Sequence, residues 1–191
     1  MLFVSIPTPS AHAAEGMLGE LGPALFKKAN SDSGMNVRSI QPSGEVLDDN
    51  DRELIKEAAL GAMMQIELSK VAAAMASSED VRMIANGELD EQAVVIVKLK
   101  EIAEAGGASL PTAPDEETIR LAGDLRREAG PGLDKMYLKK SGVEGHERLK
   151  STMGKLREDA QDPALRALAS AALPLIHTHL RMAGIEASGM N

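Results

Sequence analysis

Between residues 48 and 183, apolar side chains recur at intervals of three and four residues in four successive stretches. This spacing places them on one face of an α-helix, which turns once every 3.6 residues. Each of the first two stretches runs for about 25 residues, which corresponds to a helix roughly 40 Å long. The apolar positions are, in chain order, Leu54, Ile55, Ala58, Ala62, Leu68, Ala72 and Met75; Val81, Ile84, Leu89, Val94, Val95, Leu99 and Ile102; Ile119, Leu121, Leu125, Leu149, Met153 and Leu156; and Leu165, Leu168, Ala172, Ile176, Leu180 and Ala183.

Capping and turn residues mark the ends of these predicted helices. The acidic run that begins at Asp48 can accept hydrogen bonds from the free N–H groups of the first helix. A short turn at Ser77-Ser78 follows that helix, so the first two helices must lie antiparallel. Asp162-Pro163 places a capping residue and a first-turn proline before the last helix. The sequence therefore predicts an all-α fold, an antiparallel up-down four-helix bundle over residues 48–183 with its third helix broken near Gly130-Pro131-Gly132.

The composition agrees with a helical core and disfavours a nucleic-acid partner. Hydrophobic residues make up 43% of the chain but aromatic residues only 2%, so Ala, Leu, Ile, Val and 11 Met must fill the interior. Such side chains suit helix packing better than β-strands. The net charge of −8 opposes binding to phosphates, and Phe3, Phe26 and Tyr137 are too few to stack on bases. The chain has no cysteine, so thiolate metal sites are excluded.

The first residues indicate export. Residues 1–14 combine a short apolar run with an A-x-A motif that ends at Ala13 or Ala14, as in the last part of a secretory signal peptide. No stretch reaches the roughly 20 apolar residues that a membrane span requires. We therefore expect a periplasmic or secreted protein without a membrane span.

Residues 15–47 are predicted to form an N-terminal arm and linker. Apolar residues recur at helical spacing as far as Phe26, although Gly22-Pro23 interrupts them. The segment could be a short helix that lies on the bundle, an unfolded stretch, or a helix that binds a partner. Residues 31–44 are rich in Ser, Asn, Gly and Pro and are interpreted as a linker, and residues 184–191 as a disordered tail.

Several short motifs, in order, resemble the domain of unknown function family 4142, which comprises exported bacterial proteins regarded as ferritin-like four-helix bundles. The motifs are Glu57-Ala58-Ala59, Ile66-Glu67-Leu68-Ser69-Lys70-Val71-Ala72, Ala108-Ser109-Leu110-Pro111, Leu133-Asp134-Lys135-Met136-Tyr137 with His146 downstream, and Leu173-Pro174-Leu175 with His179-Leu180. Family members usually carry a Glu in the first bundle helix and an Asp-His pair in the second. Those positions are Gln65 and Glu91-Gln92 in this chain, so neutral amides replace the usual Glu and the usual His.

A ferritin-type di-iron site is not compatible with the sequence. Such a site needs a Glu from each of two helices and a Glu-x-x-His motif from each of the other two. The chain has no Glu-x-x-His, and the pair His177 and His179 has i, i+2 spacing, which separates the side chains by about 200° around a helix.

Two histidines are nevertheless expected to face the interior, because His146 and His179 align with the apolar stripes of their helices. Gln65, Gln92 and Tyr137 are predicted to join them in a buried polar layer. One interpretation is a hydrogen-bonded layer that fixes helix register. The alternative is a mononuclear metal or small-ligand site with His146 and His179 as candidate ligands.

The sequence does not indicate a catalytic residue, and we expect no cofactor other than the metal of that alternative. The leading hypothesis is a non-enzymatic exported bundle that acts through binding or envelope-stress protection, with an unknown small ligand, a protein partner or self-association. The rival hypothesis is a periplasmic metal-binding or redox bundle that uses the inward-facing histidines.

Overall fold

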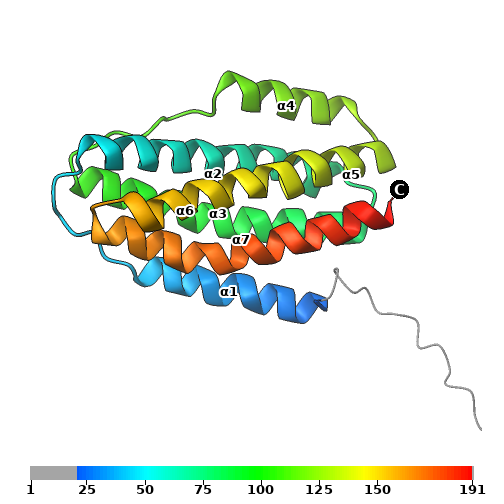
Figure 1. Cartoon of the computed structure of the whole chain (residues 1–191). Coiled ribbons are helices and arrows are strands. Elements are labelled where there is room, and N and C mark those ends of the chain that lie inside the picture. The colour runs from blue at the N-terminus through cyan, green and yellow to red at the C-terminus, as the bar shows by residue number, and fades with distance from the viewer. Residues whose placement is uncertain (1–20, 191) are drawn as a thin grey trace, which may run out of the picture.

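The computed structural model describes residues 21–190, and within that range the chain forms a series of helices joined by short connections (Figure 1). This confirms the predicted all-α class and the helical bundle. The predicted signal peptide, residues 1–14, lies outside the described residues. The helices are α1 (Pro23–Ser39), α2 (Asp49–Met75), α3 (Glu79–Ala105), α4 (Glu116–Arg127), α5 (Pro131–Tyr137), the π-helix η1 (Leu138–Gly145), α6 (His146–Asp159) and α7 (Pro163–Gly189).

The bundle consists of α2, α3, α7 and the continuous segment α5–η1–α6, which lie side by side (Figure 1). Helix α4 runs along the outside of α2 and returns the chain to the end of the bundle where α3 begins. As a result α3 and α6 run in the same direction, whereas a strict up-down order would make them antiparallel. The prolines at positions 111 and 114 and the break at residues 128–130 separate α4 from its neighbours, so α4 serves as a crossover connection.

Helix caps and buried aspartates fix the turns of the bundle. Asp48 accepts a hydrogen bond from the backbone N–H of Asp51 (2.8 Å), as the sequence predicts. The Asp51 carboxylate in turn accepts the backbone N–H groups of residues 161 and 162, at 2.9 and 2.8 Å. At the other end of the bundle, Asp134 accepts the N–H groups of Ser77 and Ser78 at 3.0 and 2.9 Å. These charge-assisted hydrogen bonds hold α2 to the turn between α6 and α7, and α5 to the turn between α2 and α3.

The core has two apolar parts, one toward each end of the bundle, with polar side chains between them. Two glycines of η1 let the backbone approach its neighbours at this level. A Cβ at Gly142 would lie 2.5 Å from the Cβ of Ala183, and a Cβ at Gly145 would lie 2.6 Å from Nε2 of Gln65. The glycines of this segment therefore permit close packing, which offsets their poor helix propensity.

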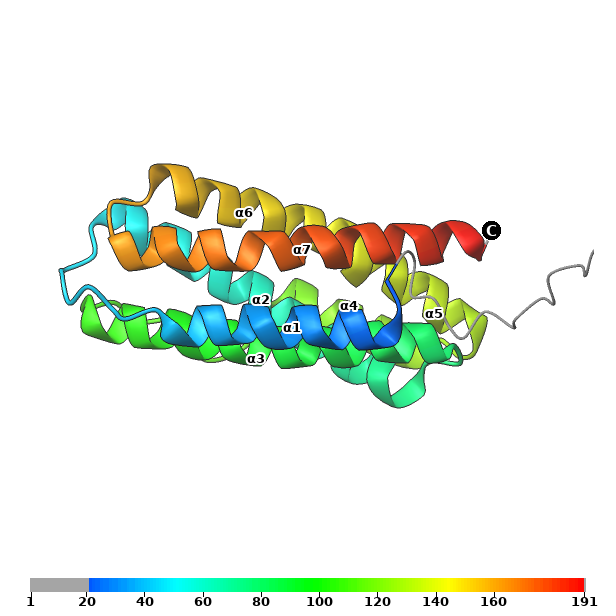
Figure 2. The ribbon, with the colours of Figure 1, turned by 90° about the horizontal axis from the view of Figure 1, so that it is seen from below.

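Helix α1 packs on α3 and α7, on the side of the bundle opposite α4 (Figures 1 and 2). It continues to Ser39, although the composition of the chain from Ser31 onward predicts a linker. The small polar residues of this stretch do not form a loop because several of them lie in the interface: Asn30 and Ser33 are buried, and Gly34 lies against Val94. Helix α7 similarly extends to Gly189, beyond the point where a disordered tail is predicted. Within residues 21–190, no helix has the length and apolar character needed to cross a membrane.

Candidate metal centre

Three ionisable side chains from three helices meet in the layer between the two apolar parts of the core. The carboxylate oxygen Oε2 of Glu88, on α3, lies 2.8 Å from Nε2 of His146 on α6 and 2.6 Å from Nδ1 of His179 on α7. The two imidazole centroids are 5.4 Å apart. Glu88 and His179 are 0% exposed and His146 is 1% exposed. A carboxylate oxygen and two ring nitrogens therefore converge in a site closed to solvent.

The outer nitrogen of each imidazole is bound to an oxygen acceptor. His146 donates from Nδ1 to the backbone carbonyl of Ser141 at 2.9 Å, and His179 donates from Nε2 to Oδ1 of Asn30 at 3.2 Å. The Asn30 amide is itself oriented, because its Nδ2 donates to the carbonyl of Phe26 at 3.0 Å. Each ring consequently turns its other nitrogen toward Glu88. Acceptor atoms that converge in this way need a proton or a metal ion between them.

The π-helix places the Ser141 carbonyl under His146. A π-helix carries an extra residue per turn and occurs frequently at functional sites. Ser141 precedes His146 by five residues, and both its carbonyl and its side chain point into the layer. Its hydroxyl donates to Oε1 of Gln65, and its carbonyl accepts from Nε2 of Gln65 at 3.2 Å. Gln65 on α2 thus holds the group that orients His146.

Tyr137 lies at the end of α5 and binds Ser69 rather than the histidines. The two hydroxyl oxygens are 2.9 Å apart, and both side chains are buried. Burial raises the pKa of Tyr137 well above its ordinary value, and the negative charge of Glu88 raises it further. Tyr137 therefore stays neutral and contributes a hydrogen bond to the edge of the layer.

The electrostatics favour an ionised Glu88. Burial by itself would raise the pKa of Glu88, but attraction to His146 and His179 and their hydrogen bonds outweigh it, so its pKa falls far below the ordinary range. Burial opposes a charge on His146 as well, yet Glu88 and the Ser141 carbonyl raise its pKa above the ordinary value. At His179 burial prevails and lowers the pKa. Glu88 thus presents a charged oxygen to the two rings.

A second carboxylate, Glu91, lies one turn further along α3. Its Oε2 is 3.7 Å from Nδ1 of His179. Burial and the charge of Glu88 raise the pKa of Glu91 well above its ordinary value. Among the residues that the structure describes, Oε1 of Glu88, both oxygens of Glu91 and Oε1 of Gln92 are buried without a hydrogen-bond partner. This half of the layer is rich in acceptors and poor in donors.

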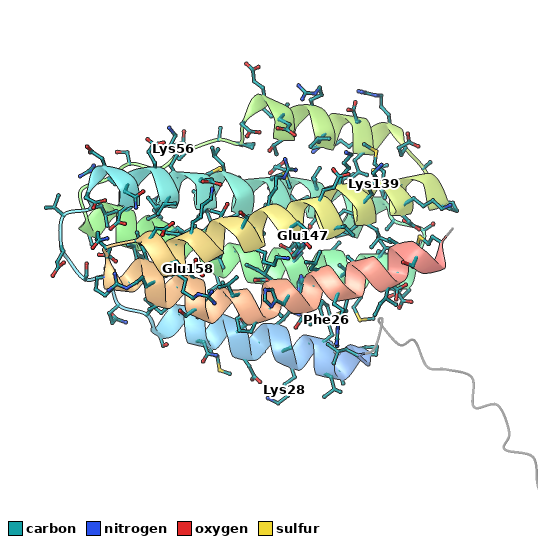
Figure 3. The ribbon with its side chains drawn as sticks, viewed as in Figure 1. Phe26, Lys28, Lys56, Lys139, Glu147 and Glu158 are labelled. Atoms are coloured by element: carbon teal, nitrogen blue, oxygen red, sulfur yellow. The ribbon has the colours of Figure 1, made fainter. Side chains whose placement is uncertain are left out.

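Helix α1 covers the layer from outside, where it packs on α3 and α7. The Phe26 ring lies 5.1 Å from the ring of His179, measured between centroids, and Asn30 binds the same histidine. Figure 3 shows Phe26 on the side of α1 that faces α7, with Lys28 on the outer side. A groove of about 1140 Å³ runs between α1 and α3, and Phe26, Asn30 and Gly87 form part of its lining. These residues separate the groove from His179.

Residues 38–184, roughly three quarters of the chain, match the family model described as domain of unknown function (DUF4142). The chain belongs to the DUF4142 family. No curated protein and no solved structure matches it. Glu88, His146 and His179 all lie within the DUF4142 region, whereas Phe26 and Asn30 precede it.

The structure brings together part of the polar layer predicted from the sequence of this DUF4142 protein. All five predicted side chains are buried. His146 and His179 share Glu88, and Nε2 of Gln65 lies 3.4 Å from Nδ1 of His146. The hydroxyl of Tyr137 forms its hydrogen bond with Ser69 and not with either histidine. Gln92 lies one turn from Glu88, and its Oε1 has no hydrogen-bond partner. His177 is exposed, as its spacing from His179 predicts.

Two residues of the centre, Glu88 and Asn30, were not predicted from the sequence. A signal for Glu88 was present, because it lies four residues after Ile84 and seven before Val95, on the same buried face. An acidic residue in an apolar stripe is a rare and informative feature. Asn30 gave no comparable signal, since its neighbourhood has the composition of a loop.

Proposed function

We propose that this DUF4142 protein binds a divalent transition-metal ion between Glu88, His146 and His179. The observation that carries the proposal is the convergence of one ligand atom from each of three helices, all within 4.8 Å of one another. Histidines that bind metals generally donate their other ring N–H to a carbonyl or carboxylate. Both histidines make such a bond, to Ser141 and to Asn30.

The donor atoms indicate the class of metal. Imidazole nitrogen and carboxylate oxygen suit Zn²⁺, Fe²⁺, Mn²⁺, Co²⁺ and Ni²⁺, whereas Cu⁺ prefers sulfur ligands. The chain has no cysteine, and the cluster contains no methionine. Met153 and Met182 are buried in the apolar core, whereas Met35 and Met75 are exposed and lie outside the cluster.

A small movement of one side chain would admit the ion. Ligands that share a tetrahedral ion at 2.0–2.2 Å stand about 3.4 Å apart. Glu88 Oε2 is 2.6 and 2.8 Å from the two nitrogens, so its carboxylate has to retreat by roughly 0.7 Å. Because Oε1 of Glu88 has no hydrogen-bond partner, this movement breaks no other hydrogen bond of the side chain.

The burial of the centre favours metal binding over turnover of a substrate. No ligand side chain is more than 1% exposed, and Phe26 and Asn30 cover His179 from outside. This supports the non-enzymatic binding role expected from the sequence. The signal peptide predicted for residues 1–14 would place the bundle in the periplasm or outside the cell, and we infer a role in envelope protection there.

Metal analysis of the chain purified without a histidine tag tests the proposal. We expect about one equivalent of Zn²⁺, Mn²⁺ or Fe²⁺ after loading and desalting, and loss of that metal in His179→Ala. His177→Ala is the matched control, because His177 lies on the same helix but faces solvent. A wild-type protein that retains no metal would refute the proposal, as would retention that ignores both His146→Ala and His179→Ala. The layer would then serve to fix helix register through shared protons.

A further inference from the structure

The half of the layer around Glu91 is rich in unpaired acceptor oxygens and adjoins the three proposed ligands. We infer that Glu91 is a fourth ligand, and that its carboxylate supplies the second negative charge that makes the centre neutral with a divalent ion. This inference rests on the proposed metal-binding function. It assigns to the centre two imidazoles and two carboxylates, a set that suits Zn²⁺, Mn²⁺ or Fe²⁺.

Helix geometry places Glu91 beside the three core ligands. Glu88 and Glu91 stand at i and i+3 on α3, so their side chains leave the same face of the helix. Glu91 Oε2 approaches Nδ1 of His179 to 3.7 Å, although Glu88 occupies the hydrogen-bonding position on that nitrogen. The separation between two ligands of one ion is about 3.4 Å. The distance from Glu91 Oε2 to Nδ1 of His179 is therefore close to the separation expected for two ligands of one ion.

The unpaired oxygens of Glu91 are a second and independent indication. The residue is 4% exposed, and neither carboxylate oxygen has a hydrogen-bond partner among residues 21–190. A buried polar atom without a partner costs free energy, and native structures contain few of them. The closest ionic partner of Glu91 is His179, itself a proposed ligand. A cation between these groups would satisfy both carboxylates.

Charge balance distinguishes Glu91 from a neutral neighbour. In a dry core, two carboxylates compensate a divalent cation, whereas Glu88 alone would leave one positive charge buried. Gln92 carries an unpaired oxygen in the same half of the layer but cannot supply charge. Glu91 is thus the side chain that makes burial of a divalent ion favourable.

The variant Glu91→Gln tests this inference, since the amide keeps the size and one oxygen but removes the charge. Asp90→Asn is the matched control, because Asp90 is the preceding residue on α3 and faces solvent. Full-length proteins would be titrated with Zn²⁺ against a chromophoric chelator, and with Co²⁺, whose visible spectrum reports the ligand set. We expect Glu91→Gln to weaken Zn²⁺ binding by on the order of 10–100-fold and to change the Co²⁺ spectrum. Asp90→Asn should match the wild type.

Each outcome decides between the two claims. Wild-type protein that binds no metal refutes the proposed function itself. Wild-type protein that binds metal, together with a Glu91→Gln variant of the same affinity and the same Co²⁺ spectrum, overturns the role of Glu91 and leaves the three-ligand centre intact. If Glu91→Gln does not fold, Glu91→Asp provides the test. It keeps the charge and shortens the reach, so we expect weakened Zn²⁺ binding, and unchanged binding would overturn the inference.

Discussion

Substitution of Gly87 by alanine should detach α1 from the layer that it covers. A Cβ at this position of α3 would lie 2.6 Å from Cζ and 2.7 Å from Cε1 of Phe26. Ordinary contacts begin at 3.4 Å, so the ring has to retreat by at least about 0.8 Å. The ring cannot move freely toward the core, because His179 lies on its other side. Relief of the clash therefore requires α1 to move away from α3.

Two opposing contributions determine how much Gly87→Ala changes the free energy of unfolding. Alanine in a helix is favoured over glycine by about 1 kcal/mol. Forcing an extra methyl group into a packed site typically costs 1–3 kcal/mol, and lost burial of a phenylalanine side chain limits the cost to about 3 kcal/mol. Gly154→Ala on α6 is the matched control, because a Cβ there meets no atom within 4 Å. The helix-propensity gain is common to both variants, so their difference isolates the clash at about 1–3 kcal/mol.

Thermal unfolding followed by far-UV circular dichroism measures this difference. For a chain of this size, 1 kcal/mol corresponds to about 2–4 °C, so Gly87→Ala should melt about 2–12 °C below Gly154→Ala. Trypsin cleavage after Lys28, on the outer side of α1 (Figure 3), should accelerate in Gly87→Ala alone. Equal melting temperatures together with equal cleavage rates would refute the claim that Phe26 anchors α1 at this glycine.

Three further predictions concern the turns, the crossover helix and the layer itself. Asp134→Ala removes the buried carboxylate that accepts the backbone N–H groups of Ser77 and Ser78, and it should lower the free energy of unfolding in urea by about 1.5–3 kcal/mol. Asp124→Ala, at an exposed ion pair, should change it by less than about 0.5 kcal/mol. Hydrogen bonds from Thr118 lower the pKa of Asp115 below its ordinary value of 3.8, so this cap stabilises α4 above pH 3.8. The stabilisation is lost as the pH falls through the lowered pKa of the folded state. An NMR titration should place the Asp115 midpoint below 3.8, and a midpoint above 3.8 would contradict the cap. Replacing all three core ligands by leucine should leave the melting temperature equal or higher, because buried ionic groups contribute little net stability; severe destabilisation would show that the layer is needed for folding.

The bundle was predictable because its signals are local. Periodic apolar residues, the Asp48 and Asp162 caps and the break at Gly130-Pro131-Gly132 are all read within a few residues of sequence. The direction of the third bundle helix was not predictable, because it depends on a tertiary contact: α4 lies along the outside of α2. The extent of α1 was also missed. Its Asn, Ser and Gly residues resemble a linker in composition, and only contact with α3 and α7 makes them helical.

The candidate site shows the same division between periodicity and contact. The inward direction of His146 and His179 follows from the helical repeat, and their burial agrees with it. That both rings meet the same oxygen of Glu88 depends on the relative rotation of α3, α6 and α7, which the sequence does not specify. The π-helix adds a further shift, because its extra residue changes which face of the segment points inward.

The position of α1 connects the fold to the proposed function. Glu88, His146 and His179, the proposed ligands, lie within the DUF4142 region. Asn30, which orients His179, and Phe26, which covers it, come from the helix before that region. A metal ion reaching the centre has to displace either this helix or one of the four bundle helices. The bundle helices bury long apolar faces against one another, whereas α1 contributes few large side chains to the core. Displacement of α1 is therefore the lower-energy route, and exchange of the metal should accelerate in Gly87→Ala, whose bundle ligands are all unchanged.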